Sequence, residues 1–184
     1  VSAGSEVQFD SNYAEFISLV YEPEVNATII VYSNGSENGI IKRATLSGTN
    51  ITVSGSTTFY NSSTKYISAA YDPVQKNIAI AYYDGANILG RVIVAHIDGS
   101  STAVYLGTPV TFNSGNTQDC SLVYDKVNQK FALFYRDLAN SNYATAIVGT
   151  VSGLSISFGS EVVFNSANSA YMSAAYDSAS GTFA

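Results

Sequence analysis

The chain has few of the residues that staple small proteins or hold metals. Among 184 residues it has one cysteine, Cys120, one histidine, His96, three prolines and no tryptophan. A single cysteine excludes a disulfide within the chain. With only one histidine and one cysteine, the usual zinc-ligand sets are not available and a Ser-His-Asp triad is disfavoured. We therefore expect a fold held by packing, with no metal, no cofactor and no catalytic residues.

Charge is scarce as well. Charged residues make up 12% of the chain, and 8 Lys plus Arg against 14 Asp plus Glu give a net charge of −6. This balance repels phosphate backbones and predicts no nucleic-acid partner. No apolar run approaches the roughly 20 residues of a membrane helix, and residues 1–5 lack both the basic and the apolar part of a signal peptide. We expect no membrane insertion.

The residues that are abundant favour β-structure. Hydrophobic residues account for 46% of the chain, with 14 Tyr and 9 Phe, and Ser, Thr, Asn and Gly fill the gaps between apolar stretches. This mixture is typical of short strands joined by tight turns. The fold class predicted is all-β, with little helix.

The sequence repeats itself with a period of about 51 residues. A Tyr followed by an acid recurs at spacings of 50, 53 and 52 residues, always with a Phe twelve residues before it and a Ser three residues before it. The copies are Tyr21-Glu22, Tyr71-Asp72, Tyr124-Asp125 and Tyr176-Asp177, with Phe9, Phe59, Phe112 and Phe164, and with Ser18, Ser68, Ser121 and Ser173. The anchors define repeats at 1–50, 51–103 and 104–155 and a partial repeat at 156–184.

Each repeat predicts four short antiparallel strands. They are an opening strand such as 156–164, a strand such as 170–176, an interior strand near 27–33, 77–83 or 130–136, and a strand that ends at Gly48, Gly99 or Gly153. Such units match the blades of a β-propeller, and about three and a half are present. Since propellers close with roughly four to eight blades, we expect further repeats of the same polypeptide, or self-assembly.

Two stretches resemble repeats of phage tail-fibre proteins and of large microbial surface proteins of the adhesin kind. They are GSEVVFNSANSAYMSAAYD at 159–177 and AIVGTVSGLSISFGS at 146–160. The resemblance runs over the whole chain and implies an exposed structural or attachment role, outside the cell or on a virion. It carries no catalytic residues. The WD40, kelch and sialidase Asp-box signatures do not fit, and Ser180 stands where an Asp box needs its acid.

The acids that follow the repeated tyrosines, Glu22, Asp72, Asp125 and Asp177, have two interpretations. A ring of carboxylates can bind Ca²⁺, but each acid also lies where a strand enters a turn. There a carboxylate accepts hydrogen bonds from nearby backbone N–H groups, and we favour this turn-capping role. A second set, Asp84 and Asp137 with Asn34 in the first repeat, is interpreted in the same way.

The best ligand candidates are polar loops that follow each Phe. An Asn amide and a Ser hydroxyl beside an aromatic ring can hydrogen-bond and stack a sugar, with one weak site per blade. Ordinary turn formation is the competing interpretation. The predicted site residues are Asn61, Ser62, Asn113, Ser114, Asn165 and Ser166, and the first repeat has Asp10-Ser11-Asn12 with Tyr13.

Three further features have simple interpretations. His96 takes the place of Thr45 and Thr150 and is predicted to be a surface residue, and Cys120 takes an apolar position and is predicted to pack in the core. Asn-x-Ser/Thr sequons would carry glycans only if the protein is exported in a glycosylating host. The sequons lie at Asn26, Asn34, Asn50 and Asn61.

The leading functional hypothesis is a non-catalytic structural or attachment repeat module. The first alternative is a propeller lectin that binds cell-surface glycans through the Asn-Ser loops. The second is a glycan-cleaving enzyme, which would need two carboxylates at a fixed separation that sequence repeats cannot reveal.

Overall fold

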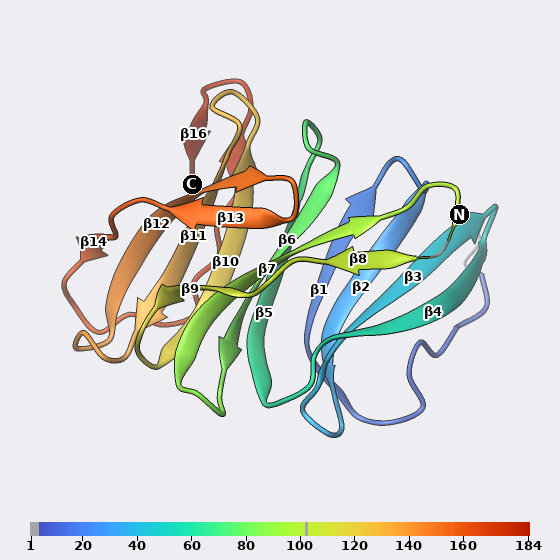
Figure 1. The fold of residues 1–184 in the computed structure, drawn as a ribbon, viewed down its shortest axis with the longest axis horizontal. Coiled ribbons are helices and arrows are strands. Elements are labelled where there is room, and N and C mark those ends of the chain that lie inside the picture. Colours follow the sequence, from blue (N-terminus) through green and yellow to red (C-terminus); the bar gives the residue numbers. More distant parts are fainter. Residues whose placement is uncertain (1–3, 102) are drawn as a thin grey trace.

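The computed structural model describes residues 4–101 and 103–184, and its regular elements are all strands. Figure 1 shows three antiparallel sheets standing side by side, with a small hairpin at the C-terminal end. Residues 1–3 and 102, which belong to the first and second predicted repeats, lie outside the described residues. The prediction of an all-β fold is confirmed.

Each sheet is built from strands in chain order. In sheets 2 and 3 the last edge consists of two short strands that both pair with the strand before them. Sheet 1 contains β1 (Ala14–Glu22), β2 (Ala27–Asn34), β3 (Gly39–Ser47) and β4 (Asn50–Tyr60). Sheet 2 contains β5 (Thr64–Asp72), β6 (Asn77–Asp84), β7 (Leu89–Ile97), β8 (Val104–Leu106) and β9 (Val110–Asn113). Sheet 3 contains β10 (Thr117–Asp125), β11 (Lys130–Asp137), β12 (Tyr143–Ser152), β13 (Ser155–Phe158) and β14 (Val162–Asn165). The hairpin, called sheet 4 below, pairs β15 (Tyr176–Asp177) with β16 (Thr182–Phe183).

The interior strands fall where the repeat predicts them. β2, β6 and β11 begin and end within one residue of the predicted ranges 27–33, 77–83 and 130–136, and each pairs with a strand on both sides. Their side chains alternate between two faces and are mostly buried on both. β6 packs against sheet 1 on one face and against sheet 3 on the other, whereas β2 and β11 each pack one face against sheet 2. This burial on both faces explains why these segments are apolar throughout.

The sheets are offset from the sequence repeats. Each sheet takes its last strand, called the outermost strand below, from the opening segment of the next repeat. The sheets therefore span 14–60, 64–113 and 117–165. The predicted opening strand at 156–164 is split into β13 and β14, which both pair with β12. Of the predicted strand at 170–176, only Tyr176 is in a strand, paired with Phe183 of β16.

The first strand of each of the three sheets, called the innermost strand below, carries the same bulge. The pairing of β1, β5 and β10 with the next strand shifts register just before the repeated serine. The residue two positions before that serine has a left-handed backbone, at φ of 49° for Phe16, 52° for Tyr66, 53° for Asp119 and 56° for Tyr171. Bulky residues rarely adopt this conformation. Its recurrence in four copies identifies the bulge as a structural rule of the repeat.

Neighbouring sheets pack face to face through apolar side chains. At the interface of sheets 1 and 2, Ile29 and Val31 join Ile78 and Ile80 in one buried cluster. At the interface of sheets 2 and 3, small residues such as Ala79 and Ala81 lie in one cluster with larger ones of sheet 3. The innermost strands β1, β5 and β10 lie next to one another along this stack.

Aromatic pairs repeat at the same place in each interface. Phe59 lies edge-on to Tyr82 at 5.5 Å between ring centroids, and Phe112 lies edge-on to Tyr135 at 5.0 Å. These are the Phe that opens a repeat and the Tyr of the interior strand of the following sheet. Edge-to-face pairs of this kind add to the stability gained from burial.

Candidate functional site

The predicted Asn-Ser loops form compact turns held by their own side chains. The Asn113 Oδ1 accepts a hydrogen bond from the Gly115 N–H at 3.0 Å, and its Nδ2 donates to the Thr117 hydroxyl at 3.0 Å. Asn165 repeats this pattern with Ala167 at 3.2 Å and Ser169 at 3.3 Å. Both amides therefore serve the turn, in agreement with the competing interpretation of the sequence.

The loops differ in how much they present to a ligand. Asn113 is buried at 8% exposure, whereas Ser114, Asn165, Ser166 and Asn61 are exposed. Ser62 is half-buried, and its carbonyl accepts a hydrogen bond from the Thr64 hydroxyl at 2.8 Å. The exposed hydroxyls are the groups that remain available for hydrogen bonding.

The loop of the first repeat borders a polar hollow. Asn12, Tyr13, Asn34, Gly35 and Ser36 line an open space of about 400 Å³. Tyr13 is 64% exposed, and its hydroxyl contacts the Glu15 carboxylate, which raises the pKa of this tyrosine. An exposed ring beside amide and hydroxyl groups is the chemistry expected for stacking a sugar.

The repeated acids cap turns, as the sequence predicts. Each accepts hydrogen bonds from backbone N–H groups two or three residues ahead, at 2.8 to 3.0 Å. Glu22, Asp72 and Asp125 are buried, at 2%, 3% and 5% exposure. Hydrogen bonds from the Asn128 side chain and backbone lower the pKa of Asp125. This part of the sequence interpretation is confirmed.

The same acids face a tyrosine of the following repeat. Burial first, and then the carboxylate of the preceding repeat, raise the pKa of Tyr71 beside Glu22 and of Tyr124 beside Asp72. Tyr176 stands in the same relation to Asp125. The Tyr124 and Tyr176 hydroxyls have no hydrogen bond of regular geometry within residues 4–101 and 103–184.

The repeated serine bridges consecutive sheets. The Ser18 Oγ accepts a hydrogen bond from the Ala69 N–H at 3.0 Å, and the Ser68 Oγ accepts one from the Leu122 N–H at 2.9 Å. The Ser121 Oγ accepts from the Ala174 N–H at 2.9 Å. In each case the serine hydroxyl accepts from a backbone N–H of the next repeat, one residue after that repeat's own serine. The sequence shows the serine as an anchor but not this role.

Replacing Ser68 with Ala is expected to lower the free energy of unfolding by about 1 kcal/mol, because the Leu122 N–H loses its acceptor. Urea unfolding followed by far-UV circular dichroism measures the change. Ser152→Ala is the matched control, because Ser152 is an exposed serine of strand β12 and lies outside the repeated inter-sheet contact. Equal losses in the two variants would contradict a role for the inter-sheet bond.

The second set of polar residues supports the turns after the interior strands. The Asn34 Oδ1 accepts the N–H groups of Ser36 and Asn38, each at 3.0 Å, and the Asp137 Oδ1 accepts the Ala139 N–H at 3.0 Å. Asp84 does the same for Asn87 at 3.2 Å and also receives the Tyr60 hydroxyl at 2.5 Å. The predicted turn chemistry is confirmed here too.

His96 and Cys120 occupy largely structural positions. His96 is half-buried, and its Nδ1 lies 3.0 Å from the Lys76 carbonyl and 3.1 Å from the Asn77 Oδ1, so the prediction of a surface residue is met only in part. Cys120 is partly buried against the core between sheets 2 and 3, and burial raises the pKa of its thiol. A thiol held neutral in this way is a poor nucleophile.

The sequons lie at turns and strand ends. Asn26, Asn50 and Asn61 are exposed, whereas Asn34 is half-buried with its oxygen engaged in the turn. The Tyr21 hydroxyl donates to the Asn26 Oδ1 at 2.8 Å.

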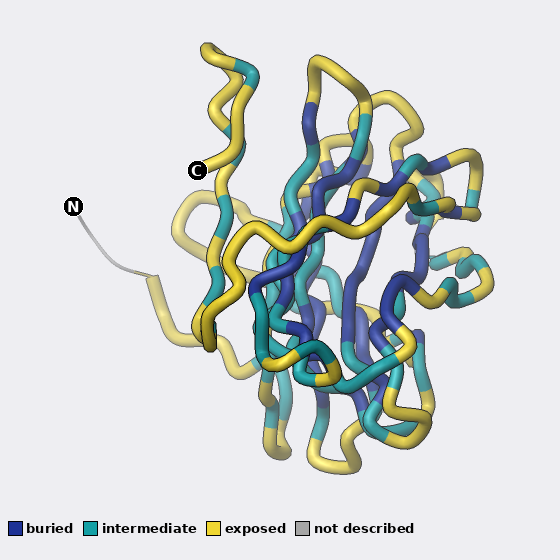
Figure 2. Tube along the Cα trace, turned by 90° about the vertical axis from the view of Figure 1, so that its left-hand side faces the viewer, coloured by how far each residue is buried: buried dark blue, intermediate teal, exposed yellow. Residues whose placement is uncertain are grey.

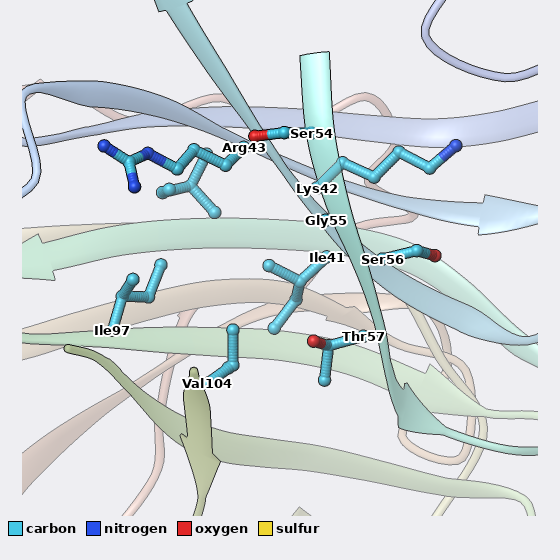
Figure 3. A pocket seen from close by; sticks show the side chains of 10 residues that line it. Ile41, Lys42, Arg43, Ser54, Gly55, Ser56, Thr57, Ile97 and Val104 are labelled. Carbon is cyan, nitrogen blue, oxygen red and sulfur yellow. The ribbon is translucent and has the colours of Figure 1, made fainter. Parts of the chain in front are cut away.

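A small hollow lies where sheets 1 and 2 meet. Ile41, Ile97, Val104 and Thr57 converge on it, while the Lys42 and Arg43 side chains extend away on either side (Figure 3). Its volume of about 20 Å³ has room for a water-sized molecule only. This hollow is an imperfection of packing and is too small for a sugar ring.

The described residues contain neither a metal-binding cluster nor a membrane-spanning helix. Outside positions 1–3 and 102, no group of three or more His, Cys, Asp or Glu side chains is arranged to hold a metal ion. The same residues include no helix long and apolar enough to cross a membrane.

Comparison with known proteins gives a likeness of fold. No family model and no curated protein matches the sequence. Among solved structures, the chain is similar to a triple arginine-to-alanine mutant of AofleA from Arthrobotrys oligospora, with a TM-score of 0.51 and 13% identity. The match covers 81% of this chain and 42% of that one, so the chain spans less than half of that protein's length.

Proposed function

We propose that this chain is a non-catalytic structural or attachment module of an exposed fibre or surface protein, of the phage tail-fibre or adhesin type. In this proposal the sheets are blades of a β-propeller, and their partners are further repeats of the same kind. The module works outside the cell or on a virion. The observation that carries the proposal is the inter-sheet contact that the chain makes three times in the same way.

That contact has the features of an assembly joint. All three copies have a serine-to-amide hydrogen bond and a carboxylate facing a tyrosine, and the two copies between full sheets add buried apolar faces. A joint of this kind places each new sheet against the last, as in other repeat proteins where each unit contacts only its neighbours. The alignment of β1, β5 and β10 supports a propeller, because blades place their innermost strands around a common axis.

The polar groups of the repeat also support a non-catalytic role. Glu22, Asp72 and Asp125 direct their oxygens to turn N–H groups, and Asn113 directs its amide to its own loop. A carboxylate that serves as a general acid or nucleophile must instead face the substrate. The glycan-cleaving alternative therefore has to rely on acids outside this repeated set.

Electron microscopy of the polypeptide that contains these repeats tests the proposal. We expect particles with regularly spaced sheets in a ring or along a fibre. Incubation with a panel of oligosaccharides, followed by chromatography, is expected to leave them uncleaved. Isolated compact particles without regular sheets, or turnover of a glycan, would reject the proposal.

A propeller lectin is the second candidate, favoured by the hollow at Tyr13. The exposed ring, with Asn12 and Ser36 beside it, borders an open space of ligand size with the predicted loop chemistry around it. A glycan array identifies any sugar that binds. Tyr13→Ala is then expected to weaken binding about tenfold or more, which corresponds to about 1.4 kcal/mol, and Tyr105→Ala, at 51% exposure away from the hollow, is the control. Equal binding by both variants would exclude this site.

A further inference from the structure

The turn between β2 and β3 contains the dipeptide Asn34-Gly35. Asn34 is the last residue of β2 and is half-buried, whereas Gly35 and Ser36 are exposed. Figure 2 shows exposed residues gathered at the turns and buried residues along the strands. An asparagine amide that precedes glycine is open to attack by the next backbone nitrogen, because glycine has no side chain to hinder the approach. The turn therefore presents a reactive pair to water.

The turn holds this amide as an oxyanion hole holds a reacting carbonyl. The Asn34 Oδ1 accepts the N–H groups of Ser36 and Asn38, each at 3.0 Å. When a nucleophile adds to the Asn34 Cγ, negative charge develops on this oxygen, and two backbone donors already point at it. Fixed donors at about 3 Å from a developing oxyanion lower the barrier to acyl transfer. The hydrogen bonds that shape the turn therefore also favour attack on Cγ.

The nucleophile is the Gly35 backbone nitrogen. The strand pairing of β2 with β3 ends at Ser33 and Gly39, so Gly35 lies outside the ladder. An ideal Cβ on Gly35 would lie 3.5 Å from the Tyr13 Cβ, which is an ordinary van der Waals contact. The peptide group of Gly35 is therefore neither part of the sheet nor tightly packed, and it has room to turn toward the Asn34 side chain.

A second Asn-Gly pair, Asn38-Gly39, is held differently. Gly39 is buried in β3, where it pairs with Ser33 of β2 and with Tyr60 of β4, the outermost strand of sheet 1. The Phe59 ring occupies the space in which a Cβ of Gly39 would lie. This peptide is fixed on both sides and cannot turn toward the Asn38 side chain. The two pairs have the same chemistry and differ only in their structural setting.

The second and third repeats have an acid in place of Asn34. Asp84 and Asp137 occupy the same position, and each uses a carboxylate oxygen to accept a backbone N–H of the turn, at 3.2 and 3.0 Å. A carboxylate at position 34 can accept the N–H groups of its own turn in the same way. Conversion of the Asn34 amide to an acid would therefore give the first repeat the side chain that the other two already have.

We propose that Asn34 is a self-modification site, at which the chain turns its own asparagine into an acid. The Gly35 nitrogen bonds to the Asn34 Cγ and gives its proton to water, while the bond from Cγ to the amide nitrogen breaks and ammonia leaves with a proton from water. One water molecule then opens the five-membered imide. Cleavage between Cγ and the Gly35 nitrogen gives aspartate, and cleavage between the main-chain carbonyl carbon and that nitrogen gives isoaspartate. Either product adds a negative charge to the polar hollow beside Tyr13, which Asn34 lines.

Peptide mapping by mass spectrometry tests the proposal on the unaltered chain, incubated at mildly alkaline pH either folded or unfolded in urea. Fragment spectra assign each new acid to Asn34 or Asn38, and isoaspartyl methyltransferase labels the isoaspartate fraction. In the folded chain Asn34 is expected to convert about tenfold faster than Asn38 or more. It should also convert at least as fast as in urea, where the two pairs react alike. A rate at Asn34 that is lower in the folded chain than in urea, or equal to that of Asn38, would overturn the proposal.

Two variants test the role of the turn hydrogen bonds. Ser36→Pro removes one of the two N–H donors to the Asn34 Oδ1 and is expected to slow conversion in the folded chain about tenfold. Ser36→Ala keeps that N–H and is the matched control, which should react like the wild type. Each rate is divided by the rate of the same variant in urea, and far-UV circular dichroism shows that both are folded. Equal ratios for the two variants would contradict the oxyanion role, and the wild-type comparison decides the proposal even where proline disturbs the turn.

Discussion

Replacing Asp84 with Asn is expected to lower the free energy of unfolding by about 3 kcal/mol, one of the larger effects in the molecule. Asp84 is fully buried, its Oδ2 receives the Tyr60 hydroxyl at 2.5 Å and the Asn87 Nδ2 at 2.8 Å, and the Arg91 Nε lies 3.2 Å from it. An amide removes the countercharge of Arg91 and one acceptor oxygen. Removal of one partner from a buried charge pair costs more than the pair contributes, because the other charge stays behind.

The effect of this substitution is expected to depend on pH. Burial alone would raise the pKa of Asp84, but hydrogen bonds from Tyr60 and Asn87 and the charge of Arg91 outweigh it and lower the pKa below 3.8. A carboxyl whose pKa is lower in the folded state stabilises the protein above its unfolded pKa, and loses this contribution as pH falls through the folded pKa. The difference between wild type and Asp84→Asn should therefore shrink below about pH 4.

Urea unfolding at several pH values measures both effects, and Asp98→Asn is the control. Asp98 accepts hydrogen bonds from Ser100 in a loop, so its substitution is expected to change the free energy of unfolding by less than about 0.5 kcal/mol. A loss for Asp84→Asn that is as small as the control, or that stays constant down to about pH 2, would show that the buried pair does not stabilise sheet 2.

Replacing Gly90 with Ala is expected to cost about 2 kcal/mol through overpacking. A Cβ at this position would lie 2.6 Å from the Phe112 ring and 2.8 Å from the Thr117 hydroxyl. Phe112 is itself held against Tyr135 of sheet 3, at 5.0 Å between centroids, so the ring cannot yield without opening the interface.

Gly153→Ala separates this steric effect from the effect of backbone conformation. Gly153 has a φ of +58° with no atom within 4 Å of its ideal Cβ, so alanine there costs only the left-handed backbone, about 1 kcal/mol. Thermal and urea unfolding of both variants measure the difference. A Gly90→Ala variant as stable as Gly153→Ala would mean that Phe112 has room to move.

The strands could be predicted because their signal is local and repeated. The segments at 27–33, 77–83 and 130–136 are apolar on both faces and bounded by turn residues, and four copies of the anchors fix their register. The turn roles of Asp72 and Asp125 followed from the same logic, since an acid at a strand end needs only nearby N–H groups. These predictions depend on contacts within a few residues.

The missed features depend on contacts between repeats. Nothing in the local sequence shows that Ser68 reaches Leu122, that Tyr60 and Arg91 meet at Asp84, or that β4 pairs with β3 of the preceding repeat. The left-handed positions at Phe16 and Tyr66 were equally hidden, because aromatic residues rarely mark such a conformation. The exposure of Leu46 depends on how the sheets pack, which the local sequence does not show.

The offset between repeats and sheets links the folding of adjacent units. Because β4 belongs to the second repeat but completes sheet 1, neither repeat can form a finished sheet without the other. A chain cut at a repeat boundary such as 50/51 would lose an edge strand, whereas a cut within 61–63 or 114–116 would keep every sheet whole. The sequence repeat and the sheet are therefore different segments of the chain. An insertion or deletion of whole units keeps every sheet intact only when its ends fall between sheets, as at 61–63 and 114–116.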